Sequence, residues 1–102
     1  MSSQAGRAEP AQYPKTFTAC FSVVAESDPN TLSRVLEPFT KRGLMPSHVY
    51  AMRVAERGDA MHIDLQLAGC DAETSWRLAN DLRGLHLVQT VLTSEKRMAE
   101  PV

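Results

Sequence analysis

The residues best able to do chemistry are three histidines and two cysteines, and their spacing suits no catalytic or metal site. His48, His62 and His86 lie far apart, and none has a second ligand two to four residues away, whereas a tetrahedral metal site needs three or four converging ligands. Cys20 and Cys70 form no Cys-x-x-Cys pair, and neither has an adjacent base. We therefore expect no catalytic residue, no metal and no cofactor, and two free thiols rather than a disulfide.

Length and charge exclude several further classes. A chain of 102 residues fits one domain, and 11 basic against 12 acidic residues give a net charge of -1, without the positive excess of a general nucleic-acid binder. No apolar run approaches the roughly 18 residues that span a bilayer. The N-terminus lacks the apolar segment of a secretory signal, which predicts a cytoplasmic location and no membrane association. We expect tails at 1–15 and 95–102, the first disordered, around a domain at 16–94.

In two segments apolar residues alternate with smaller or polar ones, which is the pattern of a strand with one buried face. Along 17–25, Phe17, Phe21 and Val23 alternate with smaller or polar residues. Along 60–68, the predicted inward residues alternate with outward polar ones, which leaves one face of this strand open to water or to a partner. The inward residues are Met61, Ile63, Leu65 and Leu67, and the outward ones are His62, Asp64 and Gln66. Further strands are predicted over 47–55 and 86–93.

Two amphipathic helices separate the strands. The first has Leu32, Val35, Leu36 and Phe39 at helical spacing and closes at Arg42-Gly43, but Pro38 predicts a kink or an early end. The second begins after Asp71, a good N-cap, and runs to about residue 83. Trp76 falls on the flank of this helix rather than on its core face, which makes it a candidate anchor for a protein interface, although a partly buried structural role stays open.

The order strand, helix, strand, strand, helix, strand is typical of an α+β, ferredoxin-like βαββαβ fold. Such a fold has a four-stranded antiparallel sheet with two helices on one face and an open opposite face. The strand at 47–55 lies at an edge, and an exposed edge invites pairing with another chain. We expect a homodimer through these edge strands, with Tyr50, Met52 and Val54 at the interface; filling of the core or edge is the alternative.

Several pieces of the sequence resemble one family in order and spacing. Leu32-Ser33-Arg34-Val35, Phe39 and Arg42-Gly43 are similar to the first helix of the small regulatory subunit of acetolactate synthase, which is built on an ACT domain. The segments 63–68 and 82–85 resemble the same family, so the likeness covers about 17 to 94. The chain looks like the short, single-domain type of that subunit.

This resemblance implies a regulatory role without chemistry of its own. The implied partner is a large, thiamine-diphosphate-dependent catalytic subunit of branched-chain amino acid biosynthesis, and the implied effector is an amino acid bound at a dimer interface. In that family the effector binds between the loop after the first strand of one chain and the start of the second strand of the other chain, and the resemblance implies the same place here. The residues at these positions are Ser27, Asp28, Asn30, Thr31 and Met45.

Other interpretations remain open at this stage. Asp28, Asn30 and Thr31 have the residue types that cap a helix, and this alone accounts for them. The chain could also be a stand-alone ACT-domain sensor of an amino acid or another small ligand, without a catalytic partner. An enzyme on this fold is the third possibility, since one architecture serves many functions.

Overall fold

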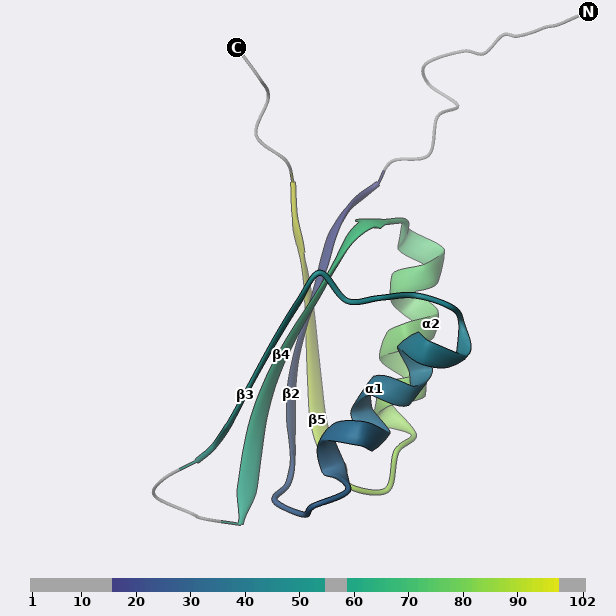
Figure 1. The fold of residues 1–102 in the computed structure, drawn as a ribbon. Coiled ribbons are helices and arrows are strands. Elements are labelled where there is room, and N and C mark those ends of the chain that lie inside the picture. Colours follow the sequence, from purple (N-terminus) through teal and green to yellow (C-terminus); the bar gives the residue numbers. More distant parts are fainter. Residues whose placement is uncertain (1–15, 55–58, 98–102) are drawn as a thin grey trace, which may run out of the picture.

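The computed structural model describes residues 16–54 and 59–97. Both helices cover the same face of one sheet, and the other face carries no helix among these residues (Figure 1). This confirms the predicted ferredoxin-like βαββαβ arrangement. The tail predicted at 1–15 and most of the tail predicted at 95–102 lie outside the described residues. The elements in chain order are β2 (Phe17–Glu26), α1 (Thr31–Lys41), β3 (His48–Arg53), β4 (Ala60–Cys70), α2 (Ala72–Arg83) and β5 (Val88–Lys96).

The four strands are antiparallel and stand in the order β3-β4-β2-β5. Strand β2 is central because it pairs with β4 on one side and with β5 on the other; Val23, for example, lies between Ile63 and Val91. Strands β3 and β5 are the two edges. The predicted edge position of the second strand in the fold is therefore confirmed.

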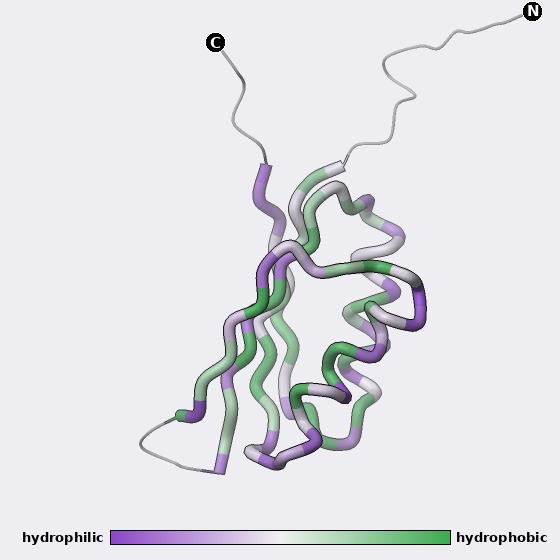
Figure 2. Tube along the Cα trace, in the orientation of Figure 1, coloured by the Kyte–Doolittle hydropathy of each residue, from purple (hydrophilic) through white to green (hydrophobic). Residues whose placement is uncertain are grey.

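The core lies between the sheet and the two helices. Every second residue of β2 from Phe17 to Ala25 is buried, as the alternation predicts, and hydrophobic positions recur along the strands in Figure 2. Phe39 of α1 meets Phe21 edge to face, with ring centroids 5.8 Å apart and planes at 86°. The other side chains without exposed surface that join this core include Val35, Ile63, Leu65, Leu78 and Leu82.

Helix α1 does not end at Pro38, so the early end that was one of the two predicted effects of this proline is wrong. It continues to Lys41, and Pro38 is buried within it. Proline removes only the one hydrogen bond that its own N–H would donate to the Arg34 carbonyl, whereas the buried side chains of Val35 and Phe39 hold the turns on either side against the sheet. The helix ends instead near Gly43, whose φ of 69° is the left-handed conformation that glycine adopts without strain.

Helix α2 starts where the sequence predicts. The Asp71 side chain accepts a hydrogen bond from the Thr74 N–H at 2.8 Å, and this N-cap bond lowers the pKa of the Asp71 carboxyl below its ordinary value. At the far end, the Arg83 guanidinium donates to the Val91 carbonyl at 3.0 Å and so ties α2 to β5.

Several strand boundaries differ from the prediction, most of all at the ends of β3 and β5. Strand β3 spans 48–53 rather than 47–55, so Val54 follows the strand, although its N–H still donates to the Ala60 carbonyl at 2.9 Å. Strand β5 continues to Lys96, so residues 95 and 96 belong to the sheet and not to the predicted C-terminal tail. Residues 95 and 96 pair with the first residues of β2, opposite Ala19 and Thr18 respectively. This pairing is a long-range contact that local sequence does not reveal.

Thr31 connects the start of α1 to the end of β2. Its hydroxyl donates to the Glu26 carbonyl at 2.6 Å, and the residue has no exposed surface. Among the described residues it is the one buried polar residue, and its side-chain bond ties the start of α1 to the end of β2.

We predict that Thr31→Val destabilises the protein by about 1–2 kcal/mol, because the part-buried hydrogen bond from the Thr31 hydroxyl to the Glu26 carbonyl is lost while the side-chain volume is kept. Urea unfolding followed by circular dichroism measures this change. Ser33→Ala is the matched control, since its hydroxyl bond to the Asn30 carbonyl is exposed. Equal effects of the two substitutions would show that the Thr31 bond does not hold the loop.

Candidate functional site

The loop between β2 and α1 is fastened to the strands on both of its sides. The Glu26 N–H donates to the Leu87 carbonyl at 2.8 Å, just before β5, and the Ser27 N–H donates to the Asp59 carbonyl at 3.0 Å, just before β4. These bonds hold residues 27–30 at the end of the sheet. The loop is therefore a preformed surface rather than a loose connection.

Asp28 organises this loop. Its side chain accepts from the Asn30 N–H at 2.8 Å, and its carbonyl accepts from the Thr31 N–H at 2.9 Å. The Asn30 side chain makes no capping hydrogen bond, so the cap of α1 comes from Asp28 and not from Asn30. Within the described residues, the N–H groups of Leu32 and Ser33 have no partner, which leaves two donors at the first turn of α1.

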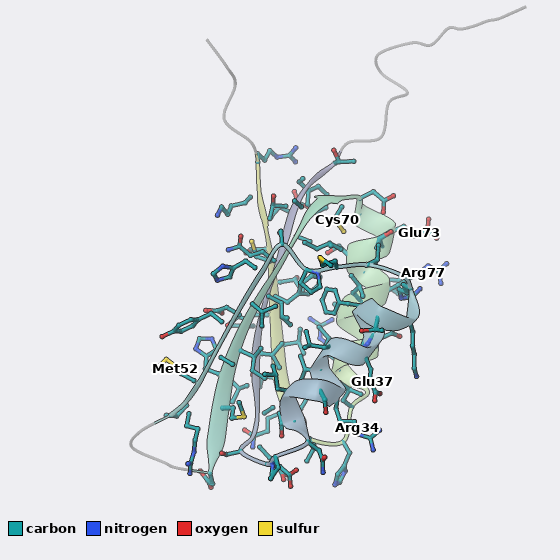
Figure 3. All side chains as sticks on the ribbon, viewed as in Figure 1. Arg34, Glu37, Met52, Cys70, Glu73 and Arg77 are labelled. Atoms are coloured by element: carbon teal, nitrogen blue, oxygen red, sulfur yellow. The ribbon has the colours of Figure 1, made fainter. Side chains whose placement is uncertain are left out.

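A groove opens beside this loop, on the side of β5. It has a volume of about 410 Å³ and lies between the start of α1 and the connection from α2 to β5. We call it the loop groove. The groove combines a carboxylate, an amide, a guanidinium and an imidazole with two leucines. Figure 3 shows Arg34 on the outer side of α1, near Glu37. Its lining residues are Asp28, Asn30, Arg34, Leu85, His86 and Leu87.

The structure brings together only part of the predicted effector set. Ser27, Asp28 and Asn30 stand in the loop, and Asp28 and Asn30 face the loop groove. Thr31 is buried and bonded to Glu26, so it does not face a ligand at this surface. Arg34 and His86 also line the groove, and the sequence analysis did not place either of them at this site. Arg34 lies one helical turn after Asn30, a spacing that could have identified it.

Met45 lies at the other end of α1, beyond its last residue, and 84% of its surface is exposed. An 11-residue helix is about 16 Å long, so Met45 does not meet Asn30 within one chain. The two-chain site that the resemblance implies, with Met45 from a second copy, therefore stays a prediction.

The helix-free face of the sheet is a second candidate surface, which we call the open face. Strand register places side chains on it, since residues directly opposite each other point to the same side. Asp64, for example, is opposite both Tyr50 and Ser22, and Ser22 is opposite Leu92. The residues that share this face include His48, Tyr50 and Met52 of β3, His62, Asp64 and Gln66 of β4, Cys20, Ser22, Val24 and Glu26 of β2, and Thr90, Leu92, Ser94 and Lys96 of β5.

A polar cluster occupies the middle of the open face. The Nε2 atom of His62 lies 2.8 Å from the Ser22 hydroxyl and 3.3 Å from an Asp64 carboxylate oxygen. A serine–histidine–aspartate relay needs the serine and the aspartate on opposite ring nitrogens. Here both approach the same nitrogen, so the cluster is not arranged to activate Ser22. The sequence reveals His62 and Asp64 as outward residues, but only the pairing of β2 with β4 brings Ser22 to them.

Three of the four predicted interface residues are exposed, and the fourth, Val54, is half-buried. Tyr50 and Met52 are 53% and 48% exposed on the open face of edge strand β3, and Figure 3 shows Met52 on the side of the sheet away from the helices. Trp76 is 64% exposed on α2, as its flank position predicts. Val54 lies just beyond β3.

Neither a disulfide, a metal-binding cluster nor a membrane-spanning helix occurs among the described residues. Cys20 and Cys70 are both free, and burial raises the pKa of the Cys70 thiol. Within 16–54 and 59–97, no group of three or more His, Cys, Asp or Glu side chains is placed to hold a metal ion. Neither described helix is long and apolar enough to cross a bilayer.

Solved structures show the same fold. The ACT domain from a GTP pyrophosphokinase of Chlorobium tepidum is similar, with a TM-score of 0.66 and 15% identity over 78% of this chain and 100% of that domain. An uncharacterized protein from Thermotoga maritima has a TM-score of 0.64 and 20% identity over 79% of this chain and 98% of its own. A formyltetrahydrofolate deformylase from Pseudomonas putida has a TM-score of 0.52 and 10% identity, over 79% of this chain but only 29% of the enzyme. No curated protein matches the sequence.

The sequence itself matches a family model described as an ACT-like domain, over residues 12–100. ACT domains are typically regulatory modules that bind ligands, and they commonly dimerise and bind amino-acid effectors. The match spans nearly the whole chain and includes both the loop groove and the open face. The chain belongs to the ACT-like domain family.

Proposed function

We propose that this chain is a non-catalytic accessory subunit that activates the large, thiamine-diphosphate-dependent subunit of acetolactate synthase, in the cytoplasm. The observation that carries the proposal is the resemblance of α1, β4 and the end of α2 to the small regulatory subunit of that enzyme. The exposed Trp76 supports it, because an exposed tryptophan on a helix can anchor a protein interface.

Trp76 gives the direct test of this partnership. Trp76→Ala is expected to weaken binding to the cognate large subunit by about 30-fold or more, the effect of losing a hot spot worth about 2 kcal/mol. Titration of the large subunit with the accessory chain, followed by acetolactate formation, measures both affinity and activation. Asn80→Ala, also exposed on α2, is the matched control. If the wild-type chain neither binds nor activates the large subunit, the partnership is wrong.

The subunit is proposed to act as a homodimer joined through β3. Hydrogen-bonded residues alternate along an antiparallel pair. Because the Val54 N–H donates to Ala60, we expect Met52 and Tyr50 to be bonded to β4 as well. Val49 and Ala51 then direct their backbone groups away from the sheet, where a second β3 can pair with them. The product is an eight-stranded sheet with a two-fold axis.

A proline at position 49, whose backbone N–H is expected to point away from β4, tests the pairing of the β3 edges directly. Val49→Pro removes an outward donor without removing a bond between β3 and β4, and proline is tolerated in edge strands. We expect the variant to weaken edge pairing by at least about tenfold, since both chains carry the proline, two hydrogen bonds of about 1 kcal/mol each are lost, and the rings crowd the facing chains. Sedimentation equilibrium measures the association. Val49→Thr keeps the N–H and the β-branched shape, and it should associate like the wild type; equal association of both variants would contradict edge pairing.

A stand-alone sensor of an amino acid is the second candidate, and the loop groove favours it. Asp28 supplies a negative charge for an α-ammonium group. The N–H groups of Leu32 and Ser33, with the nearby Arg34 guanidinium, suit an α-carboxylate. The groove volume of about 410 Å³ is ample for a single amino acid.

Calorimetric titration with a panel of amino acids tests the sensor. If one of them binds, Arg34→Gln should weaken it by about tenfold or more, because a charge-assisted hydrogen bond of about 1.5–3 kcal/mol is lost. Arg77→Gln is the control, since Arg77 pairs with Glu73 on the other helix at 2.9 Å. Absence of heat for every amino acid, with activation of the large subunit intact, would exclude the sensor and leave the accessory role.

A further inference from the structure

Strand β5 is the second edge of the sheet, and by composition it is as suited to pairing as β3. It has nine residues against the six of β3. Between residues 88 and 94 its sequence contains no charged residue and no proline, and valine, threonine and leucine prevail there. A long edge of this kind is a template for pairing with another chain, unless the protein blocks it.

The backbone bonds of β2 show which groups of β5 form the free edge. The Glu26 N–H donates to the Leu87 carbonyl, so Glu26 directs its backbone groups toward β5. Because backbone direction alternates along a strand, every second residue of β2 before Glu26 does the same. Ser22 is one of these residues, and it is opposite Leu92. Leu92 is therefore bonded to β2, and the residues on its two sides turn their backbone groups away from the sheet.

Arg83 covers one of these outward groups. The residues on the two sides of Leu92 are Val91 and Thr93. The Arg83 guanidinium reaches from the last turn of α2 and donates to the Val91 carbonyl at 3.0 Å. The bond is partly buried, and the positive charge of its donor strengthens it. A further strand would have to place an N–H at this carbonyl, where the guanidinium lies, so it must first displace Arg83.

The two ends of the β5 edge are unsuited to pairing for other reasons. Near the start of β5 the pairing with β2 shifts register and leaves Gln89 without a residue opposite it, an irregularity that interrupts a ladder. Near the other end, the Glu95 carboxylate pairs with Arg97 at 3.2 Å, and charges discourage edge pairing. The middle of β5 is thus the part where a further strand fits, and this is the part that Arg83 covers.

The β3 edge has no such cover. Val49 and Ala51 are the residues expected to turn their backbone groups outward there, since their neighbours are bonded to β4. Among the described residues, no side chain forms a hydrogen bond with either of them. The two edges of the sheet therefore differ in one respect that bears directly on pairing, the guanidinium on β5.

We propose that Arg83 determines which edge of the sheet accepts a second copy of the chain. By covering the Val91 carbonyl, it prevents β5 from pairing with the β5 strand of another copy and leaves β3 as the edge that pairs. The inference goes beyond the proposed function and does not require it. Without Arg83, β5 strands pair with each other whether or not β3 strands do.

Arg83→Met tests the proposal, by light scattering after size exclusion of the full chain over a range of concentrations. Methionine keeps an unbranched side chain of good helix propensity but has no donor. Pairing of two β5 strands then displaces no guanidinium, so it should strengthen by about 100-fold, tenfold for each of the two bonds. With both edges of every copy free, we expect the mass to exceed that of two chains and to rise with concentration.

Arg77→Met is the matched control, because Arg77 lies on the same helix and pairs with Glu73 instead of the sheet. It should keep the mass of the wild type. A second substitution distinguishes edge pairing from aggregation of a misfolded chain. Thr93→Pro removes an outward donor in the middle of β5 and no bond to β2. Added to Arg83→Met, it should return the mass to that of the wild type, whereas a proline would not repair a folding defect.

The outcomes separate this inference from the pairing through β3. A wild type with the mass of two chains, together with larger assemblies of Arg83→Met, supports both. A monomeric wild type with a dimeric Arg83→Met supports the role of Arg83 and overturns the β3 dimer. If Arg83→Met has the mass of the wild type, or if Thr93→Pro does not reverse its growth, the role of Arg83 is overturned.

Discussion

The alternation of side chains along β2 and β4 is the constraint on which the rest of the structure depends. Because successive residues of a strand point to opposite faces, Phe21, Val23, Ile63 and Leu65 must all lie on one side of the sheet. Burial of that side requires a cover, and α1 and α2 supply it (Figure 1). The same alternation places Ser22, His62 and Asp64 on the opposite side, so the core and the open face are two consequences of one pattern.

The position of the loop groove follows from how this cover is attached. The chain leaves β2 at Glu26, is bonded to the neighbouring strands on both sides, and enters α1 through the buried Thr31. These bonds fix the start of α1 against the connection before β5. Polar groups at the end of the sheet are thus held in place by backbone bonds made within the chain, which lowers the ordering cost of binding a small ligand.

Local patterns predicted the parts of the fold that depend on local physics. The alternation of β2 and β4, the Asp71 cap and the left-handed Gly43 each follow from neighbouring residues, and the structure confirms them. The other features depend on contacts distant in sequence. The packing of α1 on the sheet keeps the helix intact around Pro38, and the last residues of β5 are held by pairing with the start of β2.

The residues of the candidate site likewise divide into those that local sequence predicts and those that only long-range contacts bring together. Asp28 and Asn30 were predictable as loop residues, because turn and cap chemistry is local. Their neighbours in the loop groove, Arg34 and His86, come together only after α2 returns the chain to the end of the sheet. Thr31 was assigned to the ligand, but its hydroxyl is used by the Glu26 carbonyl, a contact that the residue type alone does not indicate.

The proposed homodimer depends on the pairing of β3 with the β3 strand of a second chain. Amide hydrogen exchange at Val49 and Ala51 measures this most directly, since their N–H groups are expected to point away from β4. Pairing between chains predicts slow exchange at both amides, which becomes faster on dilution below the dissociation constant of the dimer. Fast exchange at both positions at every concentration, with the amides of β2 still protected, would contradict the claim.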